Sequence, residues 1–224
     1  MLVATGIVIV VGLVARFASI VFYIKYYVQD TGDALFWIFD KTAVLTSIGL
    51  IGQLIGALIT PMLSARFEKH HLIIGVNVLH AVLLGICFFV PPDQFALIVL
   101  VHSLGILTFG VTITLLFSMY TDCAEYGEWK TGKNTAGLTV SASMFSLKFG
   151  SAVGGALPGF VLAGFGFVAN AAQTDQAIVG IRLMFNVLPA IFFLAGGMLM
   201  FLYKIDRHTL SRIEAELHER RGTG

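Results

Sequence analysis

Long apolar runs separated by short polar gaps dominate the pattern of this chain. A helix needs about 20 residues to cross the hydrocarbon core of a bilayer, and six runs reach or approach that length. The gaps hold charged and turn-forming residues, as loops between membrane helices do. The pattern predicts an all-α membrane protein with six transmembrane helices. We place them at Leu2–Tyr27, Thr42–Leu63, Leu72–Val90, Ala96–Tyr120, Leu138–Phe167 and Val179–Tyr203.

Composition supports this prediction and excludes several classes of protein. Of the 224 residues, 57% are hydrophobic and only 12% are charged, and the mean hydropathy is +0.89. A formal charge of +1 provides neither a basic nucleic-acid surface nor an acidic tail. Cys87 and Cys123 are too few for a metal quartet and are interpreted as packing residues. Spacings typical of hydrolases, nucleotide-binding loops and metal sites are missing from the sequence, so we expect neither an enzyme nor a bound metal or cofactor.

The first run and the charges between the runs predict the topology. The first run lacks a basic leader and a small-residue cleavage site, so we expect it to stay as a helix. Six spans put both termini on one side, which carries nine Lys and Arg residues against three on the other. The positive-inside rule then predicts that both termini are cytoplasmic. We expect a multi-pass protein of the inner (plasma) membrane. The nine are Arg66, Lys69, Lys130, Lys133, Lys204, Arg207, Arg212, Arg220 and Arg221, and the three are Lys25, Lys41 and Arg182.

Aromatic residues and the C-terminal tail refine the predicted boundaries. We expect aromatic side chains at both membrane surfaces. They are Tyr23, Tyr26, Tyr27, Phe36 and Trp37 on the outer side, and Tyr120, Trp129 and Tyr203 on the inner side. The chain then divides into a bundle, 1–203, and a cytoplasmic tail, 204–224. Leu210, Ile213 and Leu217 give the tail a helical apolar stripe, which indicates either a docking helix or a solvated tail.

Glycines at four-residue spacing occur in the second and fifth runs. Such glycines let membrane helices pack closely, and each run also has a proline nearby. These two runs are the middle members of two triplets, so the pattern predicts a 3+3 inverted repeat of the kind found in transporters, with general helix packing as the alternative. The residues are Gly49, Gly52, Gly56 and Pro61 in the second run, and Gly150, Gly154, Gly155, Gly159 and Pro158 in the fifth.

Two charged residues fall deep within apolar runs. Lys148 lies near the middle of the fifth run, where burial of a charge costs about 2.5–3.5 kcal/mol. Ser141 and Ser151 share its helical face, so we expect Lys148 to face a polar cavity, the alternative being a lysine paired with a neighbouring helix. Arg16 in the first run either lines that cavity as a ligand anchor or locks helices together. His80 and His102 are interpreted as hydrogen-bonded packing residues.

The most polar segment follows the fourth run. Asp122 and Glu125 lie one turn apart, and we expect their carboxylates to pair with Lys130, Lys133 or Arg66. Together with Glu128, this segment is interpreted as a cytoplasmic gate of breakable ion pairs. The alternative is a solvated turn, because single exposed pairs contribute little to stability.

These residues resemble the glycoside-pentoside-hexuronide:cation symporters, the melibiose permease group. The resemblance rests on the segment Asp122–Lys133, on Gly137-Leu138 and on Lys148-Phe149-Gly150. It extends over nearly the whole chain, which looks like the C-terminal half of that family. Further matching positions are Tyr26-Tyr27, 164–167, Asn170, Gln173, 180–182, Pro189, 203–206 and 213–217.

The resemblance implies a major-facilitator fold of two six-helix bundles with alternating access around a central sugar site. Lys148 matches the family's essential lysine near the sugar and cation sites, and Asp122 with Glu125 matches its cytoplasmic acidic pair, although aspartate is frequent where Glu125 stands. The family's cation-binding acids belong to an N-terminal bundle that this sequence does not contain. The implied function is symport of a sugar or glycoside with Na⁺ or H⁺ by this chain and a second six-helix half.

Three arrangements of the chain remain open from the sequence. It is a split or truncated half that pairs with another, a homodimerising half, or an inactive fragment. A noncatalytic membrane scaffold, in which the buried charges only staple helices, is the alternative function.

Overall fold

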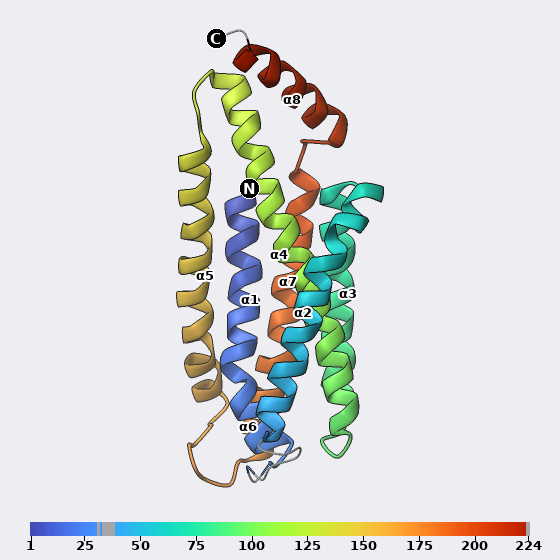
Figure 1. Ribbon diagram of the computed structural model, residues 1–224. Coiled ribbons are helices and arrows are strands. Elements are labelled where there is room, and N and C mark those ends of the chain that lie inside the picture. Colours follow the sequence, from blue (N-terminus) through green and yellow to red (C-terminus); the bar gives the residue numbers. More distant parts are fainter. Residues whose placement is uncertain (31, 33–38, 223–224) are drawn as a thin grey trace.

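The computed structural model describes residues 1–30, 32 and 39–222, which contain helices and no strand. Six helical segments are long and apolar enough to cross a membrane, which confirms the prediction of an all-α membrane protein. They lie side by side along a common direction (Figure 1). Their elements are α1 (Leu2–Phe22, continued by a π-helix at Tyr23–Tyr27), α2 (Lys41–Arg66), α3 (Lys69–Phe89), α4 (Phe95–Thr131), α5 (Ala136–Gly164) and a composite sixth span.

The sixth span is interrupted and the fourth is longer than expected. The sixth consists of α6 (Asp175–Arg182), a π-helix at Leu183–Val187, α7 (Leu188–Leu199) and a 3₁₀ turn. The fourth continues through the polar segment that we predicted as a gap, and Gly132 ends it in the left-handed conformation at φ 68°. Asp122 therefore lies nine residues before the end of the helix, so its carboxylate is not next to the free carbonyl groups of the helix C-terminus.

The two chain termini lie at one end of the bundle, which we call the terminal end; the other is the distal end (Figure 1). The tail forms α8 (Arg207–Gly222), which lies across the terminal end. Asp206 caps α8 by accepting a hydrogen bond from the Thr209 N–H at 2.8 Å. Ile213 and Leu217 are buried, so α8 is docked and not solvated.

The packing partners of the helices follow the predicted inverted repeat. α2 packs most extensively on α4, and α5 packs in the same way on α1. Likewise α3 contacts α4 as α7 contacts α1, and α3 also contacts α7. Exchanging α1 with α4, α2 with α5 and α3 with α7 maps this set of contacts onto itself. Because each triplet has three spans, the second triplet runs in the opposite direction through the membrane.

Glycines allow the main chains of the two middle helices to approach their partners. At four of them an added Cβ would press against a main-chain carbonyl oxygen of the facing helix. The pairs are Gly52 with Ser103, Gly56 with Leu107, Gly150 with Ile7 and Gly154 with Val11. We call these two contacts, α2 with α4 and α5 with α1, the glycine seams. The glycine spacing is the same in both, so one packing motif is used twice. Gly155 and Gly159, which we also expected to pack, have no atom near an added Cβ and face outward.

The aromatic boundary prediction is wrong for Tyr23. Its ring is fully buried and stacks on Phe185 with centroids 4.2 Å apart. Tyr26 and Tyr27 are half-buried at the distal end, and Phe36 and Trp37 lie outside the described residues. Among the aromatics expected on the terminal side, Trp129 is half-buried and donates from Nε1 to Glu216 of α8 at 2.6 Å, whereas Tyr120 and Tyr203 are buried.

Adjacent glycines of α5 provide a matched test of the seam. Gly154→Ala should destabilise the protein by about 1–3 kcal/mol, because the added methyl group must displace the Val11 carbonyl or the nearby Val14 side chain. Gly155→Ala should be neutral or slightly stabilising, because the methyl meets open space and alanine is the better helix former. Thermal unfolding of both variants in detergent makes the comparison. Equal stabilities would contradict the assignment of a tight seam at Gly154.

Candidate functional site

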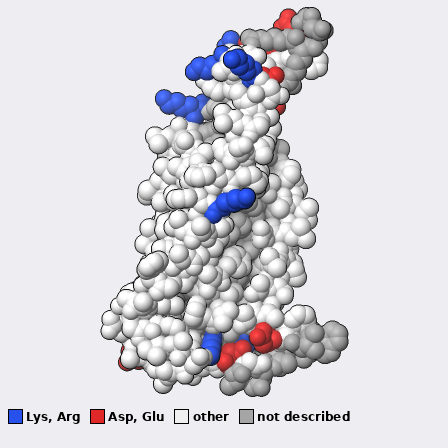
Figure 2. Space-filling model, turned by 90° about the vertical axis from the view of Figure 1, so that its left-hand side faces the viewer, with Lys and Arg blue, Asp and Glu red and all other residues white. Residues whose placement is uncertain are grey.

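Lys148 stands on the exposed face of α5. Figure 2, which views the bundle from the side of α5, shows a single cationic side chain in the middle of a wide uncharged surface, and Lys148 is the only Lys or Arg in α5. No hydrogen bond or ion pair within the described part of the chain involves its ammonium group. The alternative in which Lys148 pairs with a neighbouring helix of this bundle is therefore wrong. That it faces a polar cavity stays a prediction.

The exposed neighbours of Lys148 on α5 are of two kinds. Ser141 and Ser151 are exposed as predicted, and the Ser141 hydroxyl donates to the Gly137 carbonyl at 2.9 Å. Ala152 and Ala156 are exposed one and two turns beyond Lys148, so a second helix can approach α5 closely there. One turn before Lys148, the exposed side chains are the bulky Met144 and Phe145.

The repeat-related face of α2 has the same exposure but different chemistry. At a constant separation along the chain, the exposed positions of α2 match those of α5: Leu50 with Lys148, Leu54 with Ala152, and Leu58 with Ala156. Three leucines on one helix thus correspond to a lysine and two alanines on the other. The scaffold is symmetric, whereas the chemistry is confined to α5.

Arg16 is buried whereas Lys148 is exposed, which corrects the interpretation in which Arg16 lines the same cavity as Lys148. The Arg16 side chain is 1% exposed and lies in the interior of the bundle. Arg16 Nη2 donates to His102 Nδ1 of α4 at 2.9 Å, and the guanidinium carbon lies 4.5 Å from the centre of the Phe185 ring. Arg16 therefore ties α1 to α4 and to the sixth span, which is the helix-lock alternative. Sequence reasoning did not decide this because it does not give the rotation of α1 about its axis.

The two intramembrane histidines are packing residues, as expected. His102 fits against α2 because Gly49 has no side chain to fill the space beside Nε2. His80 shares a 2.8 Å hydrogen bond through Nδ1 with Thr108, and its ring stacks on Phe193 at 3.9 Å. Within the described residues, no group of three or more His, Cys, Asp or Glu side chains is arranged to hold a metal ion.

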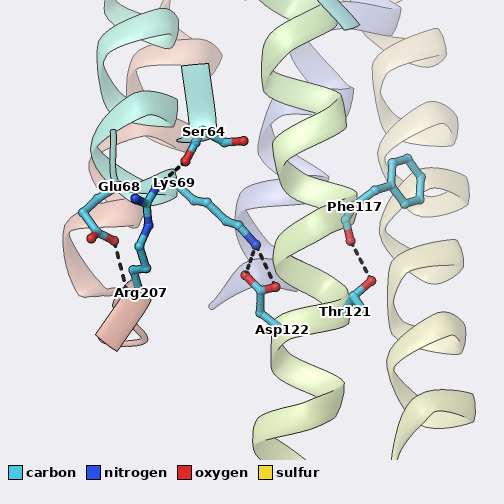
Figure 3. Close-up of polar contacts among 7 residues, drawn as sticks. All are labelled: Ser64, Glu68, Lys69, Phe117, Thr121, Asp122 and Arg207. Carbon is cyan, nitrogen blue, oxygen red and sulfur yellow. Dashed lines mark hydrogen bonds and ion pairs between the residues drawn. The ribbon is translucent and has the colours of Figure 1, made fainter. Parts of the chain in front are cut away.

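The partner of Asp122 at the terminal end is Lys69, a residue that our sequence analysis did not consider for this role. Lys69 Nζ lies 2.8 and 2.6 Å from the two carboxylate oxygens (Figure 3). Lys69 begins α3, so the pair joins the start of α3 to α4. The expected partners Lys130, Lys133 and Arg66 do not form it. Lys130 is exposed and lies 5.9 Å from the centre of the Tyr126 ring.

The other residues of the predicted gate lie farther along α4. Glu125 and Glu128 are half-buried and have contacts of their own. Water screens the Asp122–Lys69 pair little, because the Asp122 carboxylate is 6% exposed. Removing Lys69 alone would leave this buried carboxylate without a charged partner, which is the destabilising change for a buried pair.

The tail is fastened beside this ion pair. Arg207 donates to the main-chain carbonyls of Ser64 and Ala65, and its backbone N–H donates to Glu68 at 3.2 Å (Figure 3). A cavity of about 180 Å³ lies between these residues, Asp122 and α8. The tail thus holds the α2–α3 turn in place next to the ion pair.

Two titratable groups of the tail region respond to this environment. Hydrogen bonds from the Thr209 side chain and backbone lower the pKa of the Asp206 carboxyl, which keeps the cap of α8 charged. Burial raises the pKa of the Tyr203 phenol, with the nearby Cys123 and Asp122 acting in the same direction. Both groups therefore keep their ordinary protonation states at neutral pH.

The sequence of this chain is similar to a known protein family and to individual membrane carriers. The family described as MFS/sugar transport protein matches residues 1–207. The Escherichia coli (strain K12) glucuronide carrier protein homolog is 31% identical over 91% of this chain and 43% of its own length. The isoprimeverose transporter of Lactiplantibacillus pentosus is 30% identical over 88% of this chain and 39% of its own length.

A shorter relative matches this chain over a larger share of its own length. An uncharacterized 29.9 kDa protein of Pseudescherichia vulneris is 32% identical over 90% of this chain and 72% of its own length. The chain spans less than half the length of the two named carriers.

The ion pair at the terminal end can be measured with a double-mutant cycle. Asp122→Asn and Lys69→Met should each destabilise the protein, because each leaves the other residue without its charged partner, and their coupling energy should be about 1–3 kcal/mol. The same cycle with Lys130→Met in place of Lys69→Met should give a coupling near zero. Thermal or chemical unfolding supplies the energies. A larger coupling to Lys130 than to Lys69 would overturn the pairing.

Proposed function

Because the chain belongs to the MFS/sugar transport protein family, and within it to the glycoside-pentoside-hexuronide:cation symporters, we propose that it is the C-terminal half of a cation-coupled sugar or glycoside transporter. In this proposal a second six-helix bundle packs against it in the bilayer. The two bundles alternate access to a site between them, near the middle of the membrane.

The observation that carries the proposal is the exposed Lys148 ammonium group in the middle of α5. A charge facing lipid at this depth costs several kcal/mol and persists only where water or an opposite charge offsets the cost. This bundle supplies no opposite charge to Lys148 within its described residues. The alanines one and two turns beyond it leave room for a second helix, a ligand or water. A wet interior shared with a second bundle supplies what this half does not.

The names of two relatives support the proposed substrate class. Glucuronide and isoprimeverose, which the names of two relatives contain, are sugar derivatives. We propose that this chain contributes to the binding of a compound of that class, with Na⁺ or H⁺ as the coupling cation. Lys148 would organise the sugar or cation site, with Ser141 and Ser151 on the same wall.

We further propose that the terminal end is cytoplasmic and that the membrane is the inner (plasma) membrane. The excess of Lys and Arg at that end supports this orientation. The Asp122–Lys69 pair, with Glu125 and Glu128 one and two turns along, would then form part of the cytoplasmic closure. Breakable ion pairs suit a gate, because their strength changes steeply with small separations.

A noncatalytic scaffold is the competing function, and the two intramembrane cations distinguish it. A scaffold needs each buried charge to staple helices, as Arg16 does with His102. Lys148 makes no such staple within the described residues, and stapling alone does not account for a lysine on an outward face.

The test is uptake of labelled glycosides under a Na⁺ or H⁺ gradient. The chain is expressed together with a six-helix N-terminal half of a related transporter, and membrane vesicles from these cells are assayed. Lys148→Met should reduce gradient-driven uptake at least about a hundredfold, because the proposed site loses the lysine ammonium group. Membrane insertion should be unchanged. Lys204→Met, which removes an exposed lysine outside the spans, should leave uptake intact. Unchanged uptake by Lys148→Met would remove its assigned role.

A further inference from the structure

One face of α4 carries two buried polar contacts inside the bundle. His102 accepts from Arg16 of α1 at 2.9 Å, and Thr108, farther along α4, bonds to His80 of α3 at 2.8 Å. Gly105 lies midway between His102 and Thr108, so it shares their face of the helix. All five residues are buried. A position without a side chain thus separates the two polar contacts.

The hydrogen bonds of Thr108 assign the tautomer of His80. The Thr108 hydroxyl donates its one hydrogen to the Gly105 carbonyl at 2.6 Å, so it accepts from His80 Nδ1. Nε2 of a neutral imidazole then carries no hydrogen and is an acceptor. His80 is fully buried, and its Nε2 has no hydrogen-bond partner within the described residues. This acceptor requires a donor, because a buried polar atom without a partner is destabilising.

Arg16 presents the complementary groups. Its Nη2 donates to His102, whereas Nε and Nη1 are buried and have no hydrogen-bond partner in the described part of the chain. A guanidinium group can only donate, so these are unpaired donors. Arg16 is close enough to His80 to act on it electrostatically. Unpaired donors from α1 and an unpaired acceptor from α3 therefore occur in the same buried polar region.

The space beside Gly105 has room for a small group. Outside the α4 backbone and the two chain neighbours, a Cβ added at Gly105 would lie within 4 Å of only two described atoms. These are Cε1 and Nε2 of the His80 ring, at 3.8 and 3.9 Å, which is ordinary van der Waals contact. A methyl group therefore fits next to the unpaired Nε2. A water molecule is of similar size.

The repeat-related position is filled by an apolar side chain. In the glycine seams, Ile7 of α1 holds the place that Ser103 holds in α4, so Ile9 is the counterpart of Gly105. A Cβ added at Gly196 of α7, which faces Ile9, would meet the Ile9 side chain at 2.5 Å. Isoleucine thus fills the space in one repeat, whereas the other repeat has glycine and room beside a polar atom.

We propose that a water molecule is bound beside Gly105, donating to His80 Nε2 and accepting from the Arg16 guanidinium. Buried water makes two to four such bonds. An anion could accept from Arg16 but could not donate to Nε2, and an apolar group would leave both residues unpaired. The water connects the contact at His102 with the contact at Thr108, so that α1, α3 and α4 share one network. This site does not depend on the proposed transport function.

The sign of the stability change in Gly105→Ala tests the water. The added methyl group takes its place and leaves His80 and Arg16 unpaired, so the melting temperature in detergent should fall by about 2 °C or more. In a dry space the same methyl group would fill a void and alanine would favour the helix, so the melting temperature would rise. Gly155→Ala, where the methyl group meets open space, is the control and should not fall. A rise for Gly105→Ala would overturn the proposal.

Radiolytic hydroxyl labelling in H₂¹⁸O, read by mass spectrometry, separates a lost water from simple crowding. Radicals formed from a bound water oxidise the side chains next to it. His80 should be labelled in the unsubstituted protein, and this labelling should be lost in Gly105→Ala. Met119 is equally buried but lies in the apolar core, and it should stay unlabelled although methionine is the more reactive side chain. An unlabelled His80 in the unsubstituted protein would overturn the proposal even if Gly105→Ala is less stable.

Discussion

A charge placed inside a bilayer must be matched by another group, and this constraint separates the two intramembrane cations of the chain. Arg16 is matched within the bundle by His102 and the Phe185 ring, and it thereby ties three spans together. Lys148 points away from the bundle and is matched by nothing in its described part. Arg16 therefore stabilises this half. Lys148 requires water or an opposite charge from outside this half. Both follow from the same cost of isolating a charge from water.

The repeat makes it possible to identify positions where the two three-helix halves of the bundle differ. Two glycine seams bring carbonyl groups and helices together in the same way on both sides of the bundle. On that symmetric scaffold, α5 carries lysine and alanine where α2 carries leucine, and α1 and the sixth span contain π-turns that α4 and α3 do not have. In the proposed transporter, the first of these departures would lie on the wall of the site between the two bundles.

Hydropathy and glycine spacing predicted the six spans and the seams because both are properties of neighbouring residues on a single helix. The rest depends on distant contacts. Lys69 was missed because it lies 53 residues from Asp122 along the chain and reaches it only through the packing of α3 on α4. The choice between a cavity residue and a helix lock stayed open for Arg16, because the sequence does not give the rotation of a largely apolar helix about its axis. The π-turns leave no signal in an apolar run, and Gly155 with Gly159 shares the spacing of a seam without forming one.

The central claim is that Lys148 faces water and not lipid, and cysteine labelling in the native membrane tests it most directly. Lys148→Cys is made in a chain whose own Cys87 and Cys123 are replaced by alanine, and a water-soluble, membrane-impermeant thiol reagent is added. Val82→Cys, at a half-exposed apolar position of α3, reports on a side chain facing lipid. The account predicts that the cysteine at position 148 reacts and the one at position 82 does not. A cysteine at 148 as unreactive as that at 82 would place the lysine against lipid and contradict the account.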